Sequence, residues 1–156
     1  ILLSCSNLEK TANEHKIYGS CDDKFKETTF IHYKKWGFDT RFKPYLSIKN
    51  NYLRLRLVTE YAGRIWFFMD KVQFIVDGEK YEYTVNPERD VRSQYVYETD
   101  DQTGTDYIIN LLYKIANSAN KVEIRISGKE QYDSYIPDGT KGHFKKILNL
   151  YEKLKK

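Results

Sequence analysis

Residues 65–85 read IWFFMDKVQFIVDGEKYEYTV, and this stretch decides the fold class. Residues 65–76 form a long run of β-branched and aromatic side chains, and residues 81–85 form a second, shorter run. Asp77-Gly78 stands between them, and an Asp-Gly pair in this setting is the strongest short-range signal for a β-hairpin, because both residues tolerate positive φ in the turn. The predicted hairpin sets two pairs of side chains opposite each other on one face, Val72 with Tyr83 and Phe74 with Tyr81.

The β-rich pattern continues on both sides of this hairpin, and a helical pattern follows. Asn50-Asn51 suits a tight turn, and further strands are predicted at residues 28–33, 45–49, 52–58, 95–97, 122–126 and 132–136. Beyond Gly104, apolar residues recur at helical spacing, which predicts helices at about 105–117 and 140–155. We therefore expect an α+β fold, with a mainly antiparallel, curved or sandwich-like β-sheet and two helices in the C-terminal half.

Length and composition exclude several classes of protein. The chain has 156 residues, of which 40% are hydrophobic and 31% charged, which is compatible with one globular domain and excludes a fully disordered chain. Its longest apolar run, residues 65–69, is far too short to span a bilayer, which excludes a polytopic membrane protein. The net charge of +4 resides in the last helix, because residues 140–156 carry six lysines and one acid while residues 23–139 are neutral. Without a basic stripe across the body, we do not expect nucleic-acid binding.

The first residues predict where the protein resides. Ile1-Leu2-Leu3-Ser4-Cys5 looks like the end of a signal peptide that runs into a bacterial lipobox, with Leu and Ser at the required positions before the cysteine. Lipidation of Cys5 would anchor the protein in a membrane. Alternatively, Cys5 pairs with Cys21 in a disulfide that contributes roughly 3 kcal/mol. Both alternatives place the protein outside the cytoplasm, with residues 1–22 as a lipobox-like start and flexible tether and residues 23–156 as a single β-rich globular domain.

A candidate contact surface lies on the predicted strand 52–58. Tyr52, Arg54 and Arg56 share the face opposite to its leucines, and Tyr95 and Tyr97 are candidates to join them. Tyr and Arg dominate protein hot spots, because they combine a large contact area with a polar group. The alternative is that the tyrosine rings pack in the core, under a helix.

The C-terminal helix suggests two other interactions. Lys155 and Lys156 end the sequence next to a carboxylate, which suggests a plasminogen-type interaction with a host protein. The alternative is a solvated helix end, where lysine also favours the helix dipole. The basic segment 141–156 as a whole predicts, as a further alternative, a polyanion-binding module whose affinity falls steeply with salt.

No set of residues has the spacing of a known catalytic or metal-binding motif. His15, His32 and His143 are far apart, and the acids around Gly104 do not follow the order of a calcium-binding loop. We therefore expect no metal, no cofactor and no enzymatic activity. The alternative is a secreted or periplasmic hydrolase that uses carboxylates from the loops at 86–106, or an acid pair such as Glu82 with Asp90.

Several segments also resemble a known kind of protein. They are Phe25-Lys26-Glu27-Thr28-Thr29, residues 66–72, residues 76–81, Ile115-Ala116-Asn117-Ser118, and residues 126–133 together with the Lys-rich closing helix. They resemble a widespread, uncharacterised β-rich domain of small secreted proteins and lipoproteins of bacteria, and the lipobox-like start and AT-rich composition are similar to spirochaetal surface lipoproteins of the Borrelia type. The resemblance implies a fold and a place in the cell envelope but no active site.

The sequence thus predicts a lipid-anchored, extracytoplasmic protein, held at the outer membrane surface, that acts as a non-catalytic binding or structural module. Its expected partner is an envelope protein or a host protein.

Overall fold

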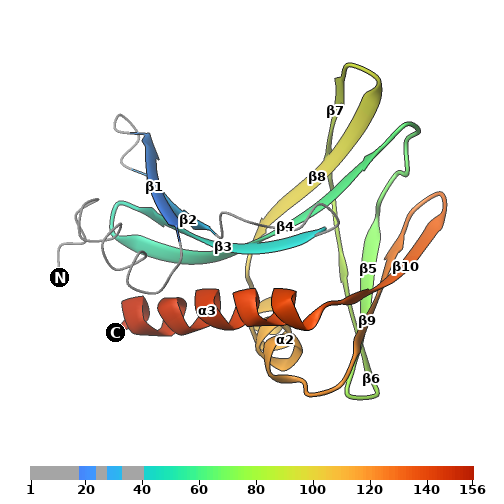
Figure 1. The fold of residues 1–156 in the computed structure, drawn as a ribbon. Helices are drawn as coiled ribbons and strands as arrows, with labels where there is room; N and C mark the ends of the chain where they lie inside the picture. The colour runs from blue at the N-terminus through green and yellow to red at the C-terminus, as the bar shows by residue number, and fades with distance from the viewer. Residues whose placement is uncertain (1–17, 24–27, 33–40) are drawn as a thin grey trace.

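The computed structural model describes residues 18–23, 28–32 and 41–156, which form ten strands in two sheets and two helices (Figure 1). The six-stranded sheet has the order β1 (Tyr18–Asp23), β2 (Thr28–His32), β3 (Phe42–Lys49), β4 (Tyr52–Gly63), β8 (Tyr95–Thr103), β7 (Glu88–Arg92). The four-stranded sheet has the order β10 (Gln131–Ile136), β9 (Val122–Ser127), β5 (Lys71–Val76), β6 (Glu79–Thr84). The helices are α2 (Asp106–Asn117) and α3 (Asp138–Lys155).

The predicted α+β class with antiparallel strands is confirmed, and so are both predicted helices. All neighbouring strands in the two sheets run antiparallel, and neither sheet closes into a barrel. Helix α2 begins after Thr105, whose side-chain oxygen accepts a hydrogen bond from the backbone N–H of Ile108. Helix α3 begins two residues earlier than expected, directly after Pro137.

The β5–β6 hairpin has the predicted register. Val72 lies opposite Tyr83, and Phe74 lies opposite Tyr81. Asp77 and Gly78 adopt φ of 51° and 85°, the left-handed values that a tight two-residue hairpin turn requires. The turn between β3 and β4 is built in the same way from Asn50-Asn51, at φ of 51° and 62°.

Other boundaries differ from the sequence prediction. Only the second half of the run 65–76 is a strand, since β5 begins at Lys71 and residues 65–70 connect the two sheets. Strand β8 continues to Thr103, well beyond residues 95–97, and the exposed edge strand β7 was not predicted at all. Strand β1 pairs with β2 and covers Tyr18–Asp23, across the boundary drawn between tether and domain.

The hydrophobic core joins both sheets to both helices. In Figure 1, α3 runs along one side of β3 and β4 with α2 next to it, and the four-stranded sheet lies at the other end of the molecule. Aromatic side chains connect the sheets: the rings of Phe42 (β3) and Phe74 (β5) are 5.4 Å apart. The hydroxyl groups of Thr59 (β4) and Tyr83 (β6) form a buried hydrogen bond of 3.0 Å. The buried faces of the helices contribute Ile108, Leu111, Leu112, Ile115, Phe144, Ile147, Leu148 and Leu150.

Candidate binding surface

The predicted Tyr/Arg face exists, but the structure uses part of it to join strands. Tyr52 is 72% exposed beside the β3–β4 turn, and Arg54 is exposed on the same face. Arg56, by contrast, donates from Nε to Asp101 Oδ1 at 3.0 Å, from Nη1 to Thr103 Oγ1 at 3.1 Å and from Nη2 to the Asp101 carbonyl at 3.1 Å. Arg56 therefore connects β4 to β8.

A tyrosine completes the network around Arg56. The hydroxyl of Tyr45, on β3, donates to Asp101 Oδ2 at 2.8 Å. Partial burial and this carboxylate together raise the pKa of Tyr45 to about 12, because both disfavour the phenolate. The network thus spans three neighbouring strands.

The other predicted contact residues are not brought together with Tyr52. The register of β4 with β8 places Tyr95 and Tyr97 at the far end of the sheet, where the Arg92 guanidinium lies 5.1 Å from the centre of the Tyr97 ring. Lys155 and Lys156 lie at the end of α3, with the Lys155 amino group 5.6 Å from the Tyr151 ring.

The structure describes the side chain of neither cysteine. Cys5 lies outside the described residues, and Cys21 lies in β1, where no side chain is described. The choice between a lipid on Cys5 and a disulfide with Cys21 therefore stays a prediction.

The carboxylates suggested for hydrolysis lie apart and have structural partners. Glu82 belongs to the four-stranded sheet and accepts a bond from Gln73, whereas Asp90 belongs to the edge strand of the other sheet. The hydrogen bond from Arg92 lowers the pKa of Asp90, whereas a general acid needs a raised one. In the described part of the chain, no group of three or more His, Cys, Asp or Glu residues is placed to hold a metal ion.

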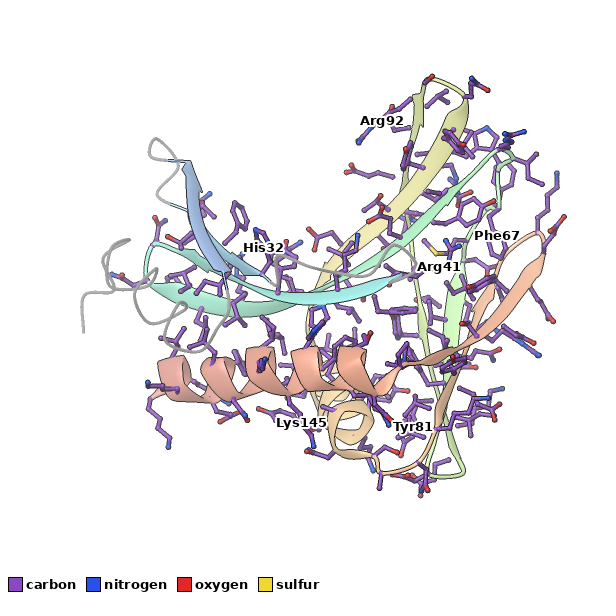
Figure 2. The ribbon with its side chains drawn as sticks, viewed as in Figure 1. His32, Arg41, Phe67, Tyr81, Arg92 and Lys145 are labelled. Atoms are coloured by element: carbon purple, nitrogen blue, oxygen red, sulfur yellow. The ribbon has the colours of Figure 1, made fainter. Side chains whose placement is uncertain are left out.

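A different surface stands out at the connection between β4 and β5. Ile65 is 62% exposed, Phe68 is 43% exposed, and Trp66 is partly buried between them. We call these three residues the apolar tip. Phe67 and Met69, on either side of Phe68, point into the core at 7% and 1% exposure. Figure 2 shows Phe67 at the end of the molecule opposite to the C-terminus.

A buried carboxylate from β8 holds the backbone of the tip. Glu98 is 0% exposed, and its Oε1 accepts hydrogen bonds from the N–H groups of Phe67 and Phe68, both at 2.7 Å. Its Oε2 accepts from the Met69 N–H at 2.8 Å. Successive N–H groups that converge on one anion form a backbone nest, and Phe68 adopts φ of 55°, which is unusual for a bulky residue. The three bonds offset the cost of this conformation.

The β9–β10 turn holds the same segment from the other side. The N–H of Lys129 donates to the carbonyl of Phe67 at 2.7 Å, and the N–H of Asp70 donates to the carbonyl of Ser127 at 3.0 Å. Gly128 makes this approach possible, since a Cβ there would lie 2.5 Å from the carbonyl oxygen of Phe67. The tip is therefore fixed by two hairpins that are distant in sequence.

Cations border the apolar tip. The Phe68 ring has the Arg89 guanidinium 5.1 Å from its centre and the Lys129 amino group 5.4 Å from it. The centres of the Trp66 and Phe68 rings are 6.4 Å apart. These two rings also line an open hollow of about 670 Å³, together with Ile65, Lys129 and Glu130. The arrangement is a small, rigid apolar surface with positive charge at its rim.

Sequence reasoning assigned this segment to a strand and missed the tip. The available signal was the uninterrupted run Ile65 to Met69, because a strand with one buried face should alternate apolar and polar residues.

Comparison with protein-family models, with curated proteins and with solved structures finds no match for this chain. Among the residues that the structure describes, no helix is long and apolar enough to cross a membrane.

Proposed function

We propose that the protein is a lipid-anchored, extracytoplasmic binding module of the cell envelope, without catalytic activity, and that the apolar tip is its contact surface. The observation that carries the binding role is the exposed tip, with Ile65 and Phe68 at 62% and 43% exposure on a backbone held by Glu98. The lipobox-like Leu2-Leu3-Ser4-Cys5 and the resemblance to bacterial lipoproteins support the location.

Rigidity favours binding through the tip. A surface that is ordered before its partner arrives loses less conformational entropy on association, and such preorganisation increases affinity. Aromatic side chains with neighbouring cations are also the groups that contribute most to contact energy. The tip combines both properties, because its backbone is fixed and its outward side chains are Ile, Trp and Phe.

Binding is favoured over hydrolysis by how the described carboxylates are used. Glu98 is occupied by three backbone N–H groups, and Asp100 accepts bonds from the Asn86 N–H at 2.9 Å and from the Gln102 amide at 2.6 Å. These acids stabilise loops and strand ends. Glu98 and Asp100 are both buried, whereas a glycosidase mechanism requires two carboxyl groups that flank a bound sugar.

The anchor can be tested in the organism that makes the protein. Wild type, Cys5→Ala and Cys21→Ala are compared by intact mass, detergent-phase partitioning and protease accessibility on whole cells. We expect a lipid-sized mass and detergent partitioning in the wild type and in Cys21→Ala, and the loss of both in Cys5→Ala. A Cys5–Cys21 disulfide in the intact protein would contradict the anchor and identify a soluble secreted or periplasmic protein.

The nature of a protein partner also stays a prediction. Deletion of Lys155 and Lys156 tests the plasminogen-type interaction directly, because terminal lysines are what such a site recognises. Unchanged plasminogen binding after the deletion would contradict it.

A further inference from the structure

We propose that the apolar tip docks on the surface of an anionic lipid bilayer, with its side chains in the interfacial region and its cations among the phosphates. This inference rests on the proposed function, since it names what the contact surface of an envelope protein touches. It adds a second membrane contact, separate from the lipid on Cys5.

The outward side chains have the chemistry of a bilayer interface. Trp is favoured where apolar chains meet headgroups, and Phe is common on apolar surfaces that enter this boundary. Ile65 adds aliphatic surface. Phe67 and Met69 are buried in the core, so that only the outward side chains of the tip can insert into the bilayer interface. The connection lies between the β7–β8 and β9–β10 hairpins, at the end of the molecule away from the C-terminus (Figure 1).

The charges around the tip suit an anionic surface. Arg64 and Lys129 are exposed, and in the described part of the chain neither has a carboxylate within ion-pair distance. Arg89 is a third cation, whose Nε lies 3.7 Å from the buried Glu98. Glu130 is the one acid among the residues that line the hollow. Lipid phosphates would supply the missing partners at the depth where the aromatic rings settle.

A lipid surface fits these observations better than a protein does. A protein partner would need a pocket shaped for Ile, Trp and Phe together, whereas a bilayer accepts any apolar side chains at the right depth.

Trp66 provides the probe. The chain contains two tryptophans, so a full-length variant with Trp36→Phe and Cys5→Ser reports on Trp66 alone and carries no lipid. It is mixed with vesicles of phosphatidylglycerol and phosphatidylcholine in equal amounts, or of phosphatidylcholine alone. We expect a blue shift of Trp66 emission and co-sedimentation with the anionic vesicles, both weakened by added salt.

Substitutions in the same background identify the contact. Phe68→Ala should weaken vesicle binding about tenfold and Lys129→Ala about fivefold, whereas Tyr52→Ala, at another exposed aromatic residue, should have no effect. Circular dichroism checks that each variant is folded, and these side chains are exposed, so truncation should leave the fold intact.

The results separate the two proposals. Absence of a Trp66 shift with anionic vesicles, or equal losses in Phe68→Ala and Tyr52→Ala, would overturn docking on lipid. If Cys5 nevertheless carries a lipid in cells, the anchor of the proposed function stands and only docking of the tip on lipid fails. If the vesicles bind but Cys5 is paired with Cys21, docking stands and the anchor does not.

Discussion

Replacement of Glu98 by Gln tests whether one buried carboxylate holds the apolar tip in place. The substitution keeps the shape of the side chain but removes its charge. Oε1 can still accept from Phe67 and Phe68, at present both 2.7 Å, but as a neutral acceptor. The new amide N–H₂ would face the N–H of Met69, which now donates to Oε2 at 2.8 Å.

The expected loss of stability follows from these contacts. Hydrogen bonds to a charged group contribute about 1.5–3 kcal/mol and neutral ones about 0.5–1.5 kcal/mol, so the two remaining bonds lose about 2 kcal/mol together. An unpaired buried N–H at Met69 adds about 1–3 kcal/mol, and relief from burying a charge offsets part of the total. We expect the free energy of unfolding to fall by about 3 kcal/mol.

The assay is urea unfolding followed by tryptophan fluorescence, combined with hydrogen exchange of individual amides. Glu98→Gln should lower the free energy of unfolding and expose the amides of residues 67–69 to exchange. The matched control is Glu60→Gln, because Glu60 pairs with Lys43 at 2.7 Å while its side chain is 33% exposed. Such a pair contributes about 0.2–1 kcal/mol. Equal stabilities of the two variants, with residues 67–69 still protected, would refute the role assigned to Glu98.

Three further predictions concern the support of the fold. Gly128→Ala should lower the free energy of unfolding by about 2 kcal/mol, because the added Cβ would collide with backbone atoms. Gly142→Ala should raise the free energy of unfolding by about 0.5–1 kcal/mol, because there is open space around this position of α3. Urea unfolding of both variants measures the two changes. A hydrogen bond from Ser118 is the main cause of the lowered pKa of Asp77. The stabilisation of the fold by ionised Asp77 is therefore present above the ordinary pKa of 3.8 and is lost as the pH falls through the lower pKa of the folded state. In the acid range, the free energy of unfolding of Asp77→Asn should therefore change less with pH than that of the wild type. The same slope against pH in both proteins would contradict the role of ionised Asp77. Burial raises the pKa of Tyr83 above 10.0, so the stabilisation of the fold by the neutral Tyr83 side chain is present below pH 10 and is lost as the pH rises further. Because phenylalanine does not ionise, Tyr83→Phe should resist alkaline unfolding better than the wild type.

Much of the architecture could be predicted because it depends on neighbours in the sequence. Asp77-Gly78 and Asn50-Asn51 form the two tight turns, since both residue types adopt positive φ at little cost. Thr105 caps the start of α2, and the apolar spacing that follows defines the buried face of this helix. The alternation along β4 placed Tyr52, Arg54 and Arg56 on one face, as predicted.

The role of each of these side chains depends on partners from distant parts of the chain. Arg56 is bound by Asp101, which no local pattern connects to it, and it therefore joins strands where the sequence suggested a contact residue. In the same way, strand β8 extends through a polar segment because β4 pairs with it as far as Thr103, whereas β7 pairs with it only as far as Thr99. Pairing with β4 satisfies backbone hydrogen bonds along the whole of this segment despite its weak intrinsic preference for strand.

The sequence by itself therefore determined the fold class, both helices and the tight turns, since short-range backbone preferences and apolar periodicity are enough for these. Only the tertiary structure decided that residues 65–70 leave the sheet and present Ile65, Trp66 and Phe68 outward. The physical reason is the partner of their backbone: the N–H groups that would have joined a strand ladder are bound by Glu98, about thirty residues away. A carboxylate that looks like one more surface acid in the sequence becomes a buried anchor when β8 brings it under the tip.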